Sequence, residues 1–175
     1  NGRQPQLTVT SNSMAPLIRA GDLIVITAAG TNFQPGDIIT FEYSSGLLTH
    51  RFWGFLSGSD HDRPLLITRG DKPLWFDPPL EPANVVGRIC ARQRGKQMLN
   101  LEMGRGKWLN HHLAWLAAFE NRGIISKVLL NGDAMVQPQK TDIPLGKRLI
   151  HWALYGWTVA VTAVIDLIGK LSVIE

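Results

Sequence analysis

Residues 37–55 read DIITFEYSSGLLTHRFWGF, and this stretch decides the fold class. It contains two runs rich in β-branched and aromatic residues, 37–43 and 47–55, on either side of a Ser-Ser-Gly segment. Runs of this kind, bounded by turn-forming residues, are typical of β-strands. The stretch therefore predicts two strands joined by a short turn.

Five further runs of the same kind lie on both sides of this stretch, at residues 7–10, 22–27, 64–69, 84–92 and 97–102. No helical period of useful length interrupts them. Many short strands at close spacing favour a sandwich or a partly closed barrel over βαβ units. We therefore expect residues 1–105 to form a β-rich domain.

The pattern becomes helical after Gly104-Arg105-Gly106. At helical spacing, one side of residues 107–121 carries Trp108, Leu109, His112, Trp115, Leu116 and Phe119, and the opposite side carries Asn110, His111 and Asn121. The chain is thus predicted to be mainly β, with a helical C-terminal extension at residues 106–175.

Residues 149–165 contain no Asp, Glu, Lys or Arg, and their seventeen residues are at the lower limit for a membrane-spanning helix. Polar side chains at helical spacing form one stripe: His151, Tyr155, Thr158, Thr162 and Asp166. The helix could lie in the membrane interface with this stripe in water, span the membrane with the stripe against a partner helix, or be a soluble helix with the stripe exposed. Four of the six tryptophans lie in the two predicted helices, which favours membrane lipid as a partner.

The composition excludes several classes of protein. With 45% hydrophobic and 18% charged residues, the 175-residue chain is not disordered, and its single cysteine, Cys90, excludes a disulfide framework and a thiolate zinc site. The net charge of +4 suits an anionic surface. Aromatic residues do not alternate with the basic tract, which we read as a solvated or headgroup-facing surface, so no nucleic-acid partner is expected. The tract consists of Arg88, Arg92, Arg94, Lys96, Arg105 and Lys107.

The segment Ser11-Asn12-Ser13-Met14-Ala15-Pro16 is the first candidate for chemistry. A loop serine is usually a turn or cap residue. Here Pro16 stiffens the loop, and Ser11 lies two residues before Ser13. A nucleophile with a second hydrogen-bond donor beside it is what acyl transfer needs.

The base candidate is His50, which alternation along its strand places on one face with Leu48 and Phe52. A buried core histidine is the simpler interpretation, but burial also keeps an imidazole neutral, as a general base requires. His61 is a rival in a polar loop. A metal site at residues 60–62 is disfavoured because consecutive ligands chelate poorly, so we expect no metal and no cofactor.

A carboxylate is needed to orient such a base, and Asp71 and Asp77 are both candidates. Each has a plainer explanation, since Asp71 follows Gly70 in a turn and Asp77 precedes Pro78. We favour Asp77 as the orienting group and Asp71 as its support, but the sequence leaves the choice open.

Taken together, residues 7–92 resemble the signal peptidase I family of membrane-associated serine proteases, in its histidine-type branch. The resemblance rests on the 11–16 segment followed by Gly21-Asp22-Leu23-Ile24-Val25, and on Pro35-Gly36-Asp37, Thr49-His50-Arg51 and Arg69-Gly70-Asp71 with Asp77. It implies a β-rich catalytic domain that removes leader peptides after small residues. It also implies that Ser13 is the nucleophile, that its own N–H forms part of the oxyanion hole, that Ser11 donates the second hydrogen bond, and that Met14 belongs to the substrate-binding box.

The resemblance implies a preprotein or leader-peptide substrate and a catalytic domain outside the cytoplasm, although a cytoplasmic leader remains an alternative. Two other functions are open. One is a self-cleaving repressor-type peptidase, which uses a lysine where this chain has His50 and carries a helical DNA-binding domain. The other is a catalytically inactive module of the same fold that binds peptide or membrane. The sequence does not indicate an oligomeric state.

Overall fold

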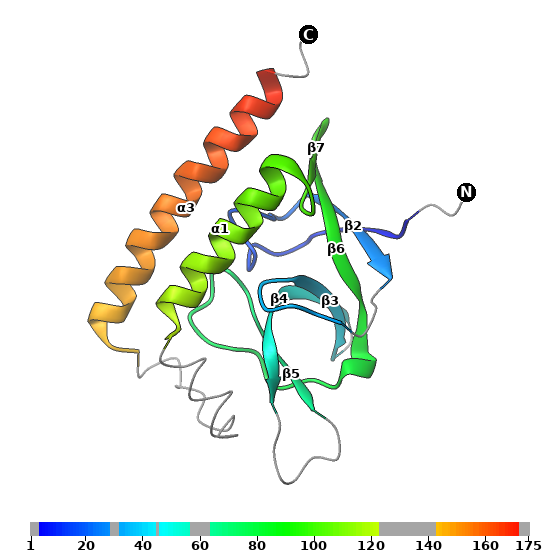
Figure 1. Cartoon of the computed structure of the whole chain (residues 1–175), viewed down its shortest axis with the longest axis vertical. Coiled ribbons are helices and arrows are strands. Elements are labelled where there is room, and N and C mark those ends of the chain that lie inside the picture. Colours follow the sequence, from blue (N-terminus) through cyan, green and yellow to red (C-terminus); the bar gives the residue numbers. More distant parts are fainter. Residues whose placement is uncertain (1–3, 29–31, 45, 57–63, 123–142, 172–175) are drawn as a thin grey trace.

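The computed structural model describes residues 4–28, 32–44, 46–56, 64–122 and 143–171 (Figure 1). Every run predicted to be extended forms a strand in these ranges. The strands are β1 (Gln6–Thr8), β2 (Leu23–Ala28), β3 (Ile38–Tyr43), β4 (Gly46–Leu56), β5 (Leu65–Arg69), β6 (Val85–Arg94) and β7 (Gln97–Asn100), with a short 3-10 turn at Pro82–Asn84. The expectation of a mainly β chain is confirmed.

One sheet holds all the described strands, in the order β1-β2-β6-β3-β4-β5, with β7 also pairing with β6. Each pair is antiparallel, so the exclusion of βαβ units is confirmed, whereas a sandwich of two sheets is wrong. The register shifts between Val25 and Ile26, between Thr40 and Phe41, and between Phe52 and Gly54. Such bulges bend and twist a sheet, so one curved sheet can enclose a core.

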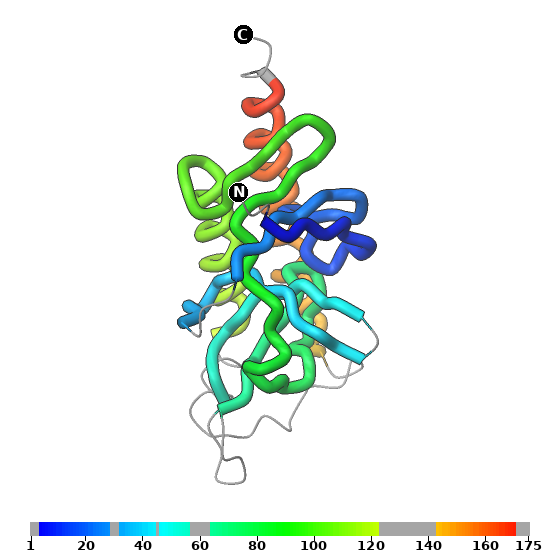
Figure 2. Tube along the Cα trace, turned by 90° about the vertical axis from the view of Figure 1, so that its right-hand side faces the viewer, coloured from blue at the N-terminus to red at the C-terminus, as the bar shows by residue number. Residues whose placement is uncertain are grey.

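Two helices, α1 (Gly104–Glu120) and α3 (Leu145–Leu171), run side by side along one side of the strands (Figure 1). A quarter turn brings the strands in front of both helices (Figure 2). Leu109 and Leu113 of α1 share a hydrophobic cluster with Ile24 of β2, and Val161 and Ile165 of α3 pack against it. The helices therefore complete the core of the strands. The division of the chain into a β-rich domain at residues 1–105 and a helical extension at residues 106–175 stays a prediction.

The side of α1 that was predicted to carry Trp108, Leu109, His112, Trp115, Leu116 and Phe119 is divided in the structure. Leu109 and Leu116 are buried, whereas Trp108, Trp115 and Phe119 are exposed. Asn121, predicted on the opposite side, is buried. Apolar residues lie on most sides of this helix, so the spacing of apolar residues in the sequence does not determine which of them face the sheet. In the structure the leucines pack against the core.

The polar stripe of α3 faces the protein. His151, Thr158 and Thr162 are buried, and Tyr155 and Asp166 are half-buried. The two interpretations that placed the stripe in water are therefore wrong. The residues from Leu145 to Lys170 are long and apolar enough to cross a membrane, and only 17% of the most apolar window is buried, unlike a core helix.

Candidate functional site

His50 lies in β4, between β3 and β5, and its side chain is buried, with a residue exposure of 5%. Its Nδ1 is 2.6 Å from Oδ2 of Asp77. The same oxygen accepts a 2.7 Å hydrogen bond from the hydroxyl of Thr68 in β5. Because an ionised carboxylate only accepts hydrogen bonds, this contact requires the proton on Nδ1, and in a neutral imidazole the lone pair is then on Nε2.

Asp77 reaches this position because the chain after β5 folds back on the strand. The backbone N–H of Asp77 donates a 2.9 Å hydrogen bond to the carbonyl of Thr68. One residue of β5 therefore holds both the backbone and the carboxylate of Asp77. This double attachment fixes the group that orients the imidazole.

Ser13 approaches His50 at Gly70. The backbone N–H of Lys72 donates to the carbonyl of Ser13 at 2.9 Å. A Cβ atom on Gly70 would lie 2.8 Å from that carbonyl oxygen and 3.0 Å from Nε2 of His50. The absence of a side chain at Gly70 thus leaves room for both the Ser13 carbonyl and Nε2 of His50, and in the described part of the chain this nitrogen has no hydrogen-bond partner.

The two serines are adjacent in space, with their Oγ atoms 3.2 Å apart. Met14 is buried in the core beneath the 11–20 loop. The loop is held by its own hydrogen bonds: the amide of Ala15 donates to the carbonyl of Asn12 at 3.1 Å, and that of Ala20 to the side-chain oxygen of Asn12 at 3.1 Å. These contacts give Ser13 a fixed place at the end of the sheet.

The two aspartates have different partners. Asp71 receives two hydrogen bonds of 2.8 Å from Nε and Nη2 of Arg51, a bidentate pair. Nη1 of the same guanidinium donates to the carbonyl of Gly36 at 2.6 Å and to the side chain of Asn110 at 2.7 Å. Arg51 is fully buried. Asp71 therefore neutralises a buried cation, whereas Asp77 contacts the imidazole.

A groove of about 300 Å³ opens beside the two serines. Residues 7–11 form one wall, and Leu47, Leu48 and Thr49 form another, with Met14 also lining it. The groove lies between two extended segments, so it can accept a peptide as an added strand.

A second buried polar group links the site to both helices. Arg69, next to Thr68 in β5, donates to Glu120 of α1 at 3.3 Å, and Glu120 also contacts Nδ1 of His151 of α3 at 2.7 Å. Burial lowers the pKa of Arg69 below its usual range. Burial opposes ionisation of Glu120, but hydrogen bonds and charges of its two partners outweigh it and lower its pKa.

The basic tract is only partly a solvated surface, which corrects that expectation. Arg88 is exposed and pairs with Glu102 at 2.7 Å, but Arg92 is buried against Asp166 at 2.5 Å. A guanidinium in the interior needs such a counter-charge.

The outer surface of the two helices is apolar and aromatic. Trp108, His112, Trp115 and Phe119 stack along α1, and the indole N–H of Trp157 in α3 donates to Nε2 of His112 at 3.2 Å. The exposed large apolar residues of α3 are Leu145, Leu149, Ile150, Trp152, Trp157, Val164, Leu167 and Ile168. Large exposed apolar patches are typical of interaction surfaces in soluble proteins.

Two sequence-based candidates cannot be placed. The rival base His61 and the disfavoured metal ligands at residues 60–62 lie outside the described residues. Within the described ranges, no group of three His, Cys, Asp or Glu side chains could hold a metal ion.

Comparison with known proteins finds no matching family model and no matching curated protein. The supporting roles of Thr68, Gly70 and Asn12 were not predicted. Thr68 and Gly70 lie in the same short segment as the predicted residue Asp71, but their contacts become visible only in the folded structure.

Proposed function

We propose that this chain is a serine endopeptidase of the signal peptidase type that removes leader or signal peptides after small residues. One observation carries the proposal: Nδ1 of His50 is bound to Asp77, while its unpartnered Nε2 and the carbonyl oxygen of Ser13 both lie against Gly70. The large majority of buried side-chain polar atoms have a hydrogen-bond partner, so a free nitrogen on a buried imidazole calls for an explanation, and a general base supplies one.

In the proposed reaction, Oγ of Ser13 attacks the carbonyl carbon of the scissile peptide bond while Nε2 of His50 takes the hydroxyl proton. Asp77 stabilises the imidazolium. The tetrahedral intermediate then expels the amine, which leaves with that proton, and water releases the acyl group by the same steps. By the family resemblance, the N–H of Ser13 and the hydroxyl of Ser11 hydrogen-bond the oxyanion.

The groove supports an extended peptide substrate. Its lining combines apolar side chains with small hydroxyl residues beside Ser11 and Ser13, which suits small side chains next to the cleaved bond, as in a leader peptide. Backbone hydrogen bonds to an added strand would bind the peptide whatever its exact sequence.

We further propose that membrane lipid contacts the outer face of α1 and α3, with the catalytic domain outside the cytoplasm. The polar stripe of α3 packs on the protein, so its exposed apolar side is free to contact lipid. The exposed tryptophans suit the headgroup region.

The proposed activity is tested with a fluorophosphonate probe and with peptides that carry alanine before the cleaved bond. Ser13→Ala and His50→Ala should each lower the rate at least about 100-fold, with the fold intact by circular dichroism. His111→Ala is the matched control, because this exposed histidine lies on α1 and its Nδ1 contacts the backbone carbonyl of Lys107 in the same helix. Near-normal rates in either site variant would overturn the assignment.

The same experiment separates the other candidates. Spontaneous cleavage of the intact chain that depends on Ser13, without cleavage of added peptide, would identify a self-cleaving peptidase. Wild-type protein that neither reacts with the probe nor cleaves peptide, but binds peptide or vesicles, would identify an inactive binding module.

Lipid binding is tested by sedimentation with anionic vesicles. Trp115→Ser combined with Trp152→Ser removes two exposed indoles, each worth about tenfold in partitioning when buried in lipid, so binding should weaken about 100-fold. Met98→Ser, at an exposed apolar residue of β7, is the control. Unchanged binding of the double variant would reject this face as the lipid contact.

A further inference from the structure

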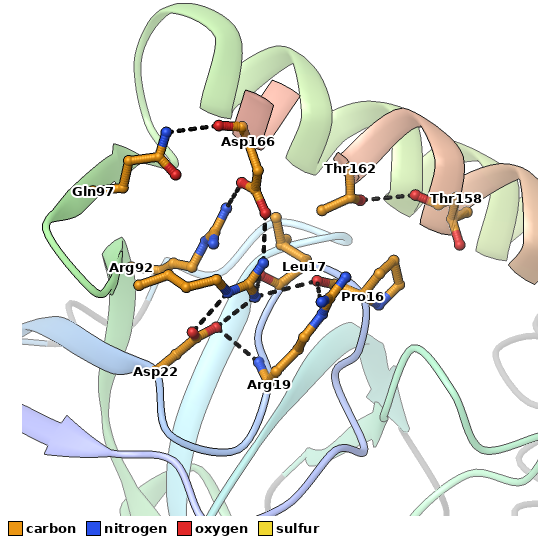
Figure 3. A network of polar contacts seen from close by, with 10 residues as sticks. Pro16, Leu17, Arg19, Asp22, Arg92, Gln97, Thr158, Thr162 and Asp166 are labelled. Carbon is orange, nitrogen blue, oxygen red and sulfur yellow. Dashed lines mark hydrogen bonds and ion pairs between the residues drawn. The ribbon is translucent and has the colours of Figure 1, made fainter. Parts of the chain in front are cut away.

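Arg94 of β6 donates hydrogen bonds to the loop that carries Ser13. Its partners Pro16, Leu17, Asp22 and Asp166 are labelled in Figure 3. Its Nη2 lies 3.2 Å from the carbonyl oxygen of Leu17 and 3.4 Å from that of Pro16. Nε and Nη2 bind the carboxylate of Asp22 at 2.8 and 2.6 Å, and Nη1 binds Asp166 at 2.6 Å. One planar guanidinium thus joins two carboxylates to two carbonyls of the loop.

Asp166 belongs to α3 and serves two arginines of β6 at once. Its Oδ2 binds Arg94, its Oδ1 binds the buried Arg92 at 2.5 Å, and its backbone carbonyl accepts a 2.7 Å hydrogen bond from Gln97. An unpaired guanidinium at the position of Arg92 would be strongly destabilising. The helix is therefore held in one register against the sheet, with its carboxylate beneath the loop.

From this geometry we propose that Asp166 is a positioning residue for Ser13. Asp22 binds the edge of the Arg94 guanidinium formed by Nε and Nη2, and Asp166 binds Nη1. The two carboxylates together hold the planar group so that Nη2 points at the loop carbonyls. The loop is short and internally bonded, because the amide of Ile18 donates to the carbonyl of Met14 at 3.0 Å. A shift at residues 16 and 17 is therefore transmitted to Ser13. The inference rests on the proposed serine peptidase function.

The consequence is that the C-terminal helix helps to position the nucleophile through Asp166, in addition to its proposed contact with lipid. A misplacement of a reacting group by about 1 Å can cost about 100-fold in rate. Substrate binding in the groove does not involve Arg94 or Asp166, neither of which lines it. Loss of the carboxylate should thus lower kcat and leave KM nearly unchanged.

The test compares Asp166→Asn with Val161→Ala. The first keeps the shape and removes the charge; the second loosens the packing of α3 on the core without touching Arg94. Three quantities are measured: kcat and KM for peptide cleavage, the rate of labelling by the fluorophosphonate probe, and amide hydrogen exchange at Ile18 and Ala20.

Asp166→Asn should lower kcat and the labelling rate at least about tenfold, with KM within about twofold, and should speed exchange at both amides. Val161→Ala should lower thermal stability but keep kcat and loop exchange close to wild type. Asp166→Glu, which keeps the charge, should recover most of the lost rate, and it provides the comparison if the asparagine variant does not fold.

Exchange in the loop of Asp166→Asn that matches wild type would overturn the proposal, whatever the activity. Equal effects of Val161→Ala on kcat and exchange would also overturn it, because helix docking alone would then suffice. Absence of Ser13-dependent activity in the wild-type protein would instead overturn the peptidase function, while the exchange comparison still decides whether Asp166 holds the loop.

Discussion

Replacing Asp77 by asparagine isolates the contribution of the carboxylate behind the imidazole. Asparagine has nearly the same shape, and its amide oxygen can still accept from Nδ1 of His50 and from the hydroxyl of Thr68. The hydrogen bonds can therefore persist, while the negative charge that faces the imidazolium is lost. The variant tests electrostatic stabilisation with little change in packing.

The size of the effect follows from the 2.6 Å contact between Nδ1 and Oδ2. It places the two charge centres roughly 4 Å apart, where opposite unit charges at an effective dielectric constant of about 20 attract by about 4 kcal/mol. This attraction exists only once the ring is protonated, so it stabilises the transition state over the ground state. A loss of about 4 kcal/mol corresponds to a rate about 1,000-fold lower.

The assay is the rate of probe labelling and of peptide cleavage by Asp77→Asn, compared with Asp71→Asn. Asp71 pairs with Arg51, so its neutralisation should reduce stability but lower the rate by less than about tenfold. The reasoning is refuted if Asp77→Asn stays within about tenfold of wild type. It is also refuted if the Asp71 variant, still folded, loses as much activity as the Asp77 variant.

Two further changes have defined outcomes. Gly70→Ala would press a methyl group against the carbonyl of Ser13 and Nε2 of His50, so activity should fall about 100-fold. Gly46→Ala is the control and should leave activity unchanged, because a Cβ atom there meets nothing within 4 Å. Wild-type kinetics of Gly70→Ala would contradict the geometry. The pKa of Glu120 is lower in the folded than in the unfolded chain. The ionised carboxylate therefore contributes its full stabilisation of the fold above the unfolded pKa of about 4.3, and this contribution disappears as the pH falls through the pKa of the folded state. Urea unfolding from pH 5 to pH 3 should therefore lose stability more steeply in wild type than in Glu120→Gln, and parallel curves would exclude this source.

Local sequence patterns were sufficient to locate the strands. Each run of β-branched and aromatic residues between turn residues became a strand, because burial on a pleated surface and turn chemistry act over a few neighbouring residues. The proposed roles of Ser13, His50 and Asp77 depend on a family resemblance in the sequence, and the proximity of these residues comes from the fold.

What the sequence left open depends on contacts between distant segments. Asp71 and Asp77 look equivalent in the chain, but the backbone bond from Asp77 to Thr68 turns one toward the ring, while Arg51 takes the other. Gly70 could be read as a turn residue, yet its missing side chain makes room for two other segments. Such functions have no local signal.

The orientation of α3 shows why an amphipathic pattern divides a helix into two faces without saying which is inside. In water the polar stripe would be expected outside, but the surface that this helix covers contains the buried cation Arg92. A buried guanidinium requires an acceptor from the element that packs over it. The face of α3 that carries Asp166 therefore packs on the sheet, and the apolar face points outward. The exposed tryptophans then lie away from the sheet. Truncating the helix would remove the counter-charge together with the proposed lipid contact, so only substitutions on its outer face can separate the two roles.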